Sequence, residues 1–453
     1  MTDPGLIITY PGYGLVFPPV PNYLTQNIVT LLTTVTVGPP TSISGGIPGI
    51  LTKLSDGTPV NNLYRNLNVD STGVVSNYNT LLASFTNTNS STIKNANYLD
   101  RTFIAYNNSA ATTYNNVFAN LEVVYGYLGI VAGTFTNADG LAAIAPNPGT
   151  VPSSINTNPI SINDFPNLRE VAGDIVIVTD YLTSIPTFPK LTRCNSVTIY
   201  LVNPLAAQTM FISQQHFPLL EYVQRFIRIY GLTKCTQIAG FDSLVTVGGF
   251  YNPQAYPANI VSLSTGISTY AGYTTDYYDN TFYDSNGIYI YGNGGVGIGL
   301  GSLVGFSSLD TVNGHIVIAN NTFQAASPNN FIYGFNTLRF CQGIFIGLSG
   351  FPNHNLHQII AFYGLQVVGF IYILDDVTPL LYRIVGFKNL KNINYDLTIG
   401  DGVNPTSKLT YLDGFAQLES VDTVTIYANT TSAILALTHI NTVANSTTVV
   451  KYA

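Results

Sequence analysis

Residues 303–321 read LVGFSSLDTVNGHIVIANN, and the same phrase recurs through the rest of the chain's second part. An aromatic residue, Phe306, is followed by apolar residues three and six positions later, and then by an alternating apolar pair, Ile316 and Ile318. Nine copies begin at Phe165, Phe188, Phe217, Phe241, Phe306, Phe335, Phe362, Phe387 and Phe415. Self-similarity at a short fixed period predicts a solenoid.

Most copies begin 23–29 residues after the previous one, which matches the leucine-rich-repeat period of about 20–29 residues. The exception is the gap between Phe241 and Phe306. We interpret it as a weak copy around Ile288 and Ile290, plus a Tyr/Gly/Asn-rich insertion at 252–286. Insertions in solenoids map to loops on one face, which is often the binding face.

Apolar residues also precede the aromatic residue at steps of three, as Leu300 and Leu303 precede Phe306. That spacing suits a coil that turns inward at every third residue, whereas the pair Ile316 and Ile318 has the period of a strand. We therefore predict a mainly β fold, a right-handed parallel β-solenoid in which each coil is an irregular or single-turn arc plus a short strand.

The phrases IVGFKNLKNINYDLTI (384–399) and IYGFNTLRFCQGIFI (332–346), together with the first one, resemble the repeat of receptor L-domains. These are leucine-rich-repeat-like solenoid modules of receptor ectodomains and microbial surface proteins. The resemblance covers about 155–441 and implies a fold and macromolecular binding, with no catalytic residues to transfer. The chain lacks the cysteine-rich modules that flank receptor L-domains, which argues against a signalling receptor.

The N-terminal third has a different pattern. We predict an extended arm (1–60), a helical region (61–140), a Pro-containing linker (141–163) and then the solenoid (164–445). The helices are predicted from apolar spacings of three and four residues. These apolar positions are Val74, Tyr78, Leu81 and Phe85, and then Tyr114, Val117, Phe118, Leu121, Val124, Tyr125 and Leu128. The helical region is either a cap for the solenoid or a module for oligomerisation or anchoring.

Charged residues make up 9% of the chain, against about 25% in ordinary globular domains. The 31 Tyr residues and the many Asn residues leave a surface with little electrostatic repulsion, which favours packing against like subunits. The net charge of −7 argues against nucleic acid as a partner. No apolar stretch is long enough for a membrane span, and the N-terminus does not read as a signal peptide. The composition equally fits an AT-rich genome.

The candidate chemistry is sparse. Cys194, Cys235 and Cys341 occupy apolar positions of the repeat, which predicts buried thiols. Asp375 and Asp376 follow a predicted strand, where some β-helix glycosidases carry catalytic aspartates. However, Asp376 stands three residues beyond Ile373, and Asp180, Asn293, Asn321 and Asn429 stand at the same step in their copies. This pattern favours a polar turn position that bonds backbone groups.

The remaining motifs are weak. His354 and His357 lack the third ligand that a catalytic zinc normally needs. The glycine-rich stretch 292–299 is typical of a turn rather than of a phosphate-binding loop. We therefore predict no catalytic residue, cofactor or metal site.

Three classes of function stay open. The first is a non-enzymatic structural or surface protein that packs with itself or other structural proteins into a virion layer, fibre or coat. The second is an adhesin-like module that binds a glycan or protein, and the third is a β-solenoid glycosidase. The repeats and the Asn-rich, Lys-poor composition resemble proteins of large DNA viruses of amoebae, which implies a virion or extracellular surface, with the cytoplasm as the alternative. The candidate contact residues in the gap between Phe241 and Phe306 are Tyr251, Tyr256, Tyr270, Tyr273, Tyr277, Tyr278 and Tyr283.

Overall fold

The fold is seen in a computed structural model. It describes residues 165–201, 207–248, 286–295, 297–325, 327, 330–348, 352–374, 380–400, 409–428 and 444–451, and the short stretches 63–64, 67–69, 75–77, 98–99, 103–106, 121–124 and 128–131. The chain divides into two compact units, Met1–Val197 and Thr198–Ala453. Strand β9, Arg193–Tyr200, contains the border between them.

In the first unit, two series of short parallel strands both end on one long strand, β8 (Glu170–Val178). The strands are β1 Leu63–Tyr64, β2 Leu67–Val69, β3 Val75–Asn77, β4 Tyr98–Leu99, β5 Phe103–Tyr106, β6 Val123–Val124, β7 Leu128–Val131 and β8 Glu170–Val178. The parallel pairs are β1–β4–β6–β8 and β2–β5–β7–β8. The exception is β3, which pairs with β2 in antiparallel fashion.

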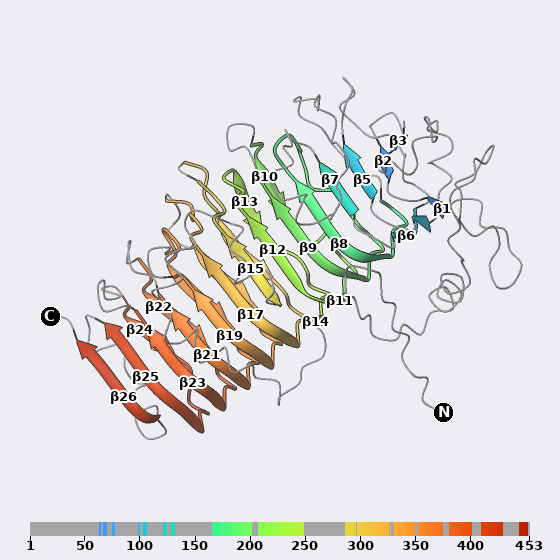
Figure 1. Cartoon of the computed structure of the whole chain (residues 1–453). Helices are drawn as coiled ribbons and strands as arrows, with labels where there is room; N and C mark the ends of the chain where they lie inside the picture. The colour runs from blue at the N-terminus through green and yellow to red at the C-terminus, as the bar shows by residue number, and fades with distance from the viewer. Residues whose placement is uncertain are drawn as a thin grey trace, which may run out of the picture. The chain divides into compact units, whose positions relative to one another are not determined.

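The second unit has two sheets whose described strand pairs are all parallel (Figure 1). The long-strand sheet contains β11 Tyr222–Val223, β12 Phe226–Tyr230, β14 Thr246–Val247, β15 Gly287–Tyr291, β17 Thr311–Ala319, β19 Phe340–Ile346, β21 Val367–Ile373, β23 Asn392–Ile399, β25 Ser420–Ala428 and β26 Ala444–Lys451. The short-strand sheet contains β10 Met210–Ile212, β13 Cys235–Ile238, β16 Ser302–Gly305, β18 Phe331–Gly334, β20 Gln358–Ala361, β22 Arg383–Gly386 and β24 Tyr411–Asp413.

Each coil runs through a short strand, a corner, a long strand and a turn, and equivalent residues of successive coils lie in register. Ile316 of β17 pairs with Ile288 of β15 and Ile344 of β19. Leu303 of β16 pairs with Ile332 of β18. All five side chains are 0% exposed, so the apolar core lies between the two sheets and continues from coil to coil. Burial of this apolar column is the main force that holds the coils together.

The repeated phenylalanines form the corners of the coils. All nine are at most 1% exposed, which confirms the predicted inward position. In the second unit the rings stack on one another, as Phe306 does on Phe335 with centroids 4.7 Å apart. Phe306 has a φ of 58° and Phe335 one of 56°, a left-handed conformation that bulky residues rarely adopt. The stacked, buried rings offset this local strain.

The glycine before the phenylalanine is required by the same corner. Gly305 has a φ of 123°, and a Cβ atom there would lie 2.2 Å from the carbonyl oxygen of Gly240 in the preceding coil. No side chain fits in that space, because the backbone of Phe306 donates a hydrogen bond to the same oxygen at 3.0 Å. The close packing of successive backbones therefore explains the glycine before Phe306, whereas Ala361 takes the equivalent position before Phe362.

The structure corrects three sequence-based interpretations. The first is the irregular or single-turn arc, because the residues before the corners from Phe217 onwards form the second parallel sheet rather than a loop. In β16, Leu303 points inward and the next residue of the same alternation is Gly305. The strand therefore has one inward apolar side chain, which is too few to show the alternating pattern of a strand in the sequence.

The second correction concerns the predicted N-terminal helices. Where the structure describes them, these residues are strands: β3, β6 and β7 lie in the segments predicted to be helical. The steps from Leu121 to Val124 and Leu128 are three and four residues, which fit a helix but also fit Leu168, Val171 and Ile175 of the repeat. Strands β1, β2, β4 and β5 also lie in the region 61–140. Apart from these seven strands and residues 121–122, that region lies outside the described residues, as do the arm 1–60 and the linker 141–163.

The third correction concerns the weak copy around Ile288 and Ile290. These residues are the apolar pair of the copy that begins at Phe241, because β14 and β15 both pair with β17 and together take the place of one long strand. The insertion therefore interrupts a strand rather than adding a coil. Its ends meet, since the Asn286 side chain donates a hydrogen bond to the Gly248 carbonyl at 3.2 Å.

Candidate interaction surface

The polar turn position forms a buried asparagine ladder in the second unit. Asn293, Asn321 and Asn353 are each 0% exposed. The Asn321 side-chain oxygen accepts hydrogen bonds from the backbone and the side-chain amide of Asn293, at 3.1 and 3.0 Å. The Asn321 amide donates to the Ile290 carbonyl at 2.9 Å and to the Asn353 oxygen at 3.0 Å. The predicted backbone-bonding role is confirmed for Asn293 and Asn321.

The side-chain amides of the ladder donate to backbone carbonyls of neighbouring coils, so these asparagines hold the turns together. Asn353 was missed from the sequence, since it stands seven residues after Ile346 instead of three. Asp180 is also buried, at the turn that follows β8. Asp375, Asp376 and Asn429 lie outside the described residues.

The weak motifs have structural surroundings. His354 and His357 precede β20, and their carbonyls accept hydrogen bonds from Phe323 and Tyr382 of neighbouring coils. Within 292–299, the backbones of Gly295 and Ile298 bond each other in a tight turn. Among the described residues, no group of three His, Cys, Asp or Glu side chains could hold a metal ion.

The three cysteines are free thiols that are 0% exposed, which confirms their predicted burial. Burial raises the pKa of Cys235 and of Cys341 to about 12, and it raises the pKa of Cys194 well above its ordinary value. The Cys341 thiol donates to the Gly343 carbonyl at 3.2 Å. A buried protonated thiol is a poor nucleophile.

We expect these thiols to react with a disulfide reagent only after denaturation. Because the folded-state pKa of Cys235 and Cys341 lies above the ordinary value of 9.0, their contribution to stability is complete below pH 9 and is lost as the pH rises towards 12. Labelling with the disulfide reagent at pH 8, with and without denaturant, measures the reactivity of each thiol. Fast labelling of any one thiol in the native protein would contradict its burial.

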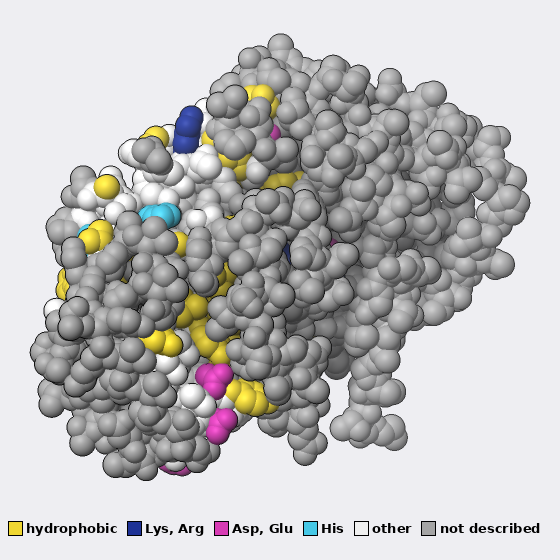
Figure 2. Space-filling view, turned by 60° about the vertical axis from the view of Figure 1, so that its left-hand side comes forward, with side chains coloured by type: hydrophobic (Ala, Val, Ile, Leu, Met, Phe, Trp, Pro, Cys, Tyr) yellow, Lys and Arg dark blue, Asp and Glu magenta, His cyan; other side chains and the backbone are white. Residues whose placement is uncertain are grey.

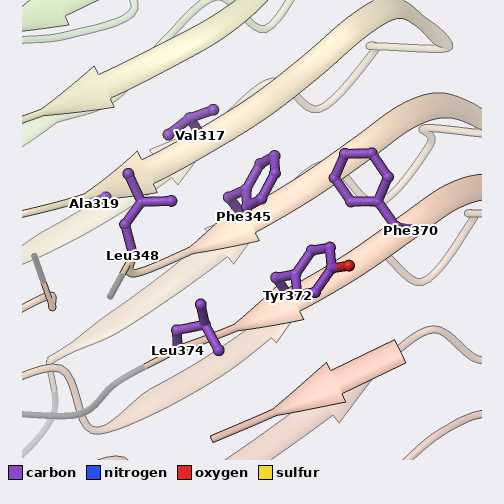
Figure 3. Packing of buried hydrophobic residues seen from close by; sticks show 7 residues of the cluster. All are labelled: Val317, Ala319, Phe345, Leu348, Phe370, Tyr372 and Leu374. Atoms are coloured by element: carbon purple, nitrogen blue, oxygen red, sulfur yellow. The ribbon is translucent and has the colours of Figure 1, made fainter. Parts of the chain in front are cut away.

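An aromatic cluster covers the outer side of the long-strand sheet (Figure 3). Val317 of β17, Phe345 of β19 and Tyr372 of β21 occupy one row of the outer face, between the inward positions. The Phe345 and Tyr372 rings stack with centroids 5.4 Å apart. The members of the cluster are at most 4% exposed, so in the folded chain this row is a second, external core. The Tyr372 hydroxyl donates to Asp396 at 2.8 Å.

His315 lies at the edge of this cluster, 4% exposed. Its ring contacts Phe370, with centroids 5.5 Å apart, and its Nδ1 atom has no hydrogen-bond partner. Burial lowers the pKa of His315 to about 4, because the charged imidazolium would lose its hydration there.

We expect His315 to make the protein sensitive to acid. The folded-state pKa of His315 lies below the ordinary 6.5. Its contribution to the free energy of unfolding is therefore complete above pH 6.5 and is lost as the pH falls towards 4. Between pH 7 and pH 5 the free energy of unfolding should fall by about 2 kcal/mol from this residue. Urea unfolding at both pH values should show a smaller decrease for His315→Gln. An equal decrease in both proteins would contradict the assignment.

The outer side of the short-strand sheet is different, because several of its apolar side chains are exposed or partly exposed, although Val385 of β22 in the row of Tyr333 is buried. We call it the short-sheet outer face. Phe211 of β10 is 52% exposed, Tyr333 of β18 is 46% exposed and Tyr411 of β24 is 48% exposed. Successive members of this trio are three strands apart, which corresponds to about 14 Å. Val304, Phe331 and Ile360 lie between them and are partly exposed.

The charged groups of the short-sheet outer face lie at one end. Arg383 stands in register with Tyr411, with its guanidinium carbon 5.4 Å from the ring centroid, and it donates to Gln358 at 3.4 Å. Asp413 pairs with Lys388 at 3.7 Å. Figure 2 shows one face of the molecule, on which apolar side chains and a few charged ones are visible among the described residues.

The sequence did not single out the short-sheet outer face. Its residues alternate with the inward ones, as Phe331 and Tyr333 flank Ile332, and this local alternation is the signal that could have revealed it. The predicted contact tyrosines of the insertion, Tyr251 to Tyr283, lie outside the described residues, so their role stays a prediction.

The part of the chain that the structure describes has no helix long and apolar enough to cross a membrane. A comparison of the chain with protein-family models, with curated proteins and with solved structures finds no match. An inference about function therefore rests on the chain's own residues and their geometry.

Proposed function

We propose that this protein is a non-enzymatic structural or surface protein that packs against copies of itself, or against other structural proteins, through the short-sheet outer face. The observation that carries the proposal is the set of half-exposed aromatic residues, Phe211, Tyr333 and Tyr411, on a rigid sheet. Exposed apolar groups on a regular element favour a protein partner. Tyrosine adds contact area together with a hydroxyl for hydrogen bonding.

The low charge of the chain supports the same function. With 9% charged residues, the surface offers few like charges to keep copies apart. A virion layer, a fibre or a coat needs such contacts repeated many times. The proposed location is accordingly a virion or an extracellular surface, in line with the resemblance to viral and receptor-like repeats.

The finer class of the fold belongs to the proposal as well. Parallel strands that are connected within one sheet nearly always form right-handed crossovers, which supports a right-handed coil. The Gly-Phe phrase with its period of 23–29 residues supports a coil of the leucine-rich-repeat or receptor L-domain type.

A pair of matched variants tests the packing surface. Tyr333→Lys with Tyr411→Lys places two cations on the short-sheet outer face. Leu219→Lys with Val245→Lys is the control, because these side chains are 47% and 43% exposed but lie outside that sheet. Light scattering and negative-stain imaging of the purified proteins measure assembly.

We expect the wild-type protein to form large regular assemblies, and the tyrosine variant to need at least a tenfold higher concentration to do so. The control variant should assemble like the wild type. A wild-type protein that stays small, or two variants that assemble equally well, would overturn the proposal. A well-behaved monomer that binds a glycan would favour the adhesin class instead.

A further inference from the structure

Strand β26, Ala444–Lys451, has a described partner strand on one side only. β26 pairs with β25 over seven residue pairs, from Val421 with Ala444 to Ala428 with Lys451. Among the described strands, no other one pairs with β26, and Figure 1 shows it outermost, beside β25. Every second residue of such a strand directs its N–H and C=O groups away from the sheet, which leaves a row of donors and acceptors for another strand.

Nothing in the sequence of β26 protects this edge. It reads ANSTTVVK, with four successive β-branched residues at 447–450 and with neither proline nor glycine. β-branched residues favour strands, whereas proline, bulges and inward charges are the usual devices against edge pairing. The single charge, Lys451, stands at the strand's end. The first unit differs, since β2 there is flanked by the antiparallel strand β3.

We propose that two copies of the chain associate by antiparallel pairing of β26 with β26, which makes the long-strand sheet continuous across a two-fold axis. A second copy of β26 has the same length and the same composition as this edge strand. A two-fold contact uses the same surface on both copies and closes after one addition. Antiparallel pairing also gives well-aligned hydrogen bonds between strands. This inference does not depend on the short-sheet outer face.

Single cysteine variants locate the symmetry axis. In a two-fold antiparallel pair, one position of β26 lies opposite itself at about 5 Å between Cα atoms, a distance that a disulfide spans. A cysteine is introduced in turn at Ser446, Thr447, Thr448 and Val449 of the full chain. The native thiols are buried and do not interfere. We expect cross-linking into dimers to peak at one position. We also expect the Tyr333→Lys/Tyr411→Lys variant, below the concentration at which it assembles further, to have twice the chain mass of 48.9 kDa.

Proline variants distinguish the loss of edge pairing from the loss of folding. Of the neighbouring variants Thr447→Pro and Thr448→Pro, one removes an N–H group that faces β25 and the other removes one that faces outward. The outward variant should raise the dimer dissociation constant at least tenfold with an unchanged unfolding midpoint. The lysine variants at Tyr333 and Tyr411 should leave the cross-linking profile unchanged, so this proposal and the packing proposal can fail separately.

Two results would overturn the inference. One is a monomer throughout the micromolar range with no cross-linked dimer. The other is a larger assembly in which no position of β26 cross-links to itself, since that result would indicate head-to-tail contact between unlike ends.

Discussion

Replacing Phe335 with alanine is expected to lower the free energy of unfolding by about 3–5 kcal/mol. The ring is 0% exposed and stacks between Phe306 and Phe362, at 4.7 and 5.1 Å between centroids. Removal of the ring leaves a cavity in the stack of phenylalanines. The rings above and below are held by their own coils, so they cannot move in to fill it. Urea unfolding measures the loss, and Tyr333→Ala is the exposed control.

The backbone conformation of Phe335 allows a second test. Glycine is normally less stabilising than alanine, but a φ of 56° penalises any residue that has a Cβ atom by about 1–2 kcal/mol. We therefore expect Phe335→Gly to be at least as stable as Phe335→Ala. A loss no larger than that of Tyr333→Ala, or a glycine variant clearly weaker than the alanine variant, would contradict the strained corner.

The second large effect is expected for Asn321→Ala, which should cost about 3–5 kcal/mol. The side chain satisfies the Ile290 carbonyl and the Asn293 amides, and it gives the Asn353 oxygen a second donor beside the Asn321 backbone. These groups belong to the buried ladder. Each buried polar group that is left without a partner costs about 1–3 kcal/mol. No alanine methyl group can replace these bonds.

Asn336→Ala is the matched control for the ladder. Its side-chain oxygen has no hydrogen-bond partner, so its removal should cost less than about 1 kcal/mol. Both variants are measured by urea unfolding at the same pH. If the two losses are equal, the asparagine ladder does not hold the turns together.

The inward residues were predictable from the sequence because stacking imposes the same choice on every coil. Phe306, Leu309 and Ile316 each lie above an equivalent residue, so the requirement for an apolar group repeats and becomes visible as a period. The short strands escaped detection because β16 and its neighbours have one apolar inward residue, and their second inward position is the glycine of the corner.

The candidate surface could not be predicted in the same way. Phe211, Tyr333 and Tyr411 point to the solvent side, where no neighbouring coil demands a given residue, so they follow no period. The strands of the first unit were hidden for another reason. The spacing of Leu121, Val124 and Leu128 satisfies both a helix and this coil, and only the pairing with β8 decides between them.

The interrupted strand implies that the peptide chain need not be continuous at that point. β14 is held by β11 and β17, and β15 by β12 and β17, so each half-strand has its own partners on both sides. A protease cut between residues 249 and 285 should therefore leave a nicked protein that unfolds as one body. Fragments 1–248 and 286–453, expressed separately, should reassemble on mixing, and the same junction should accept a foreign domain without loss of the fold.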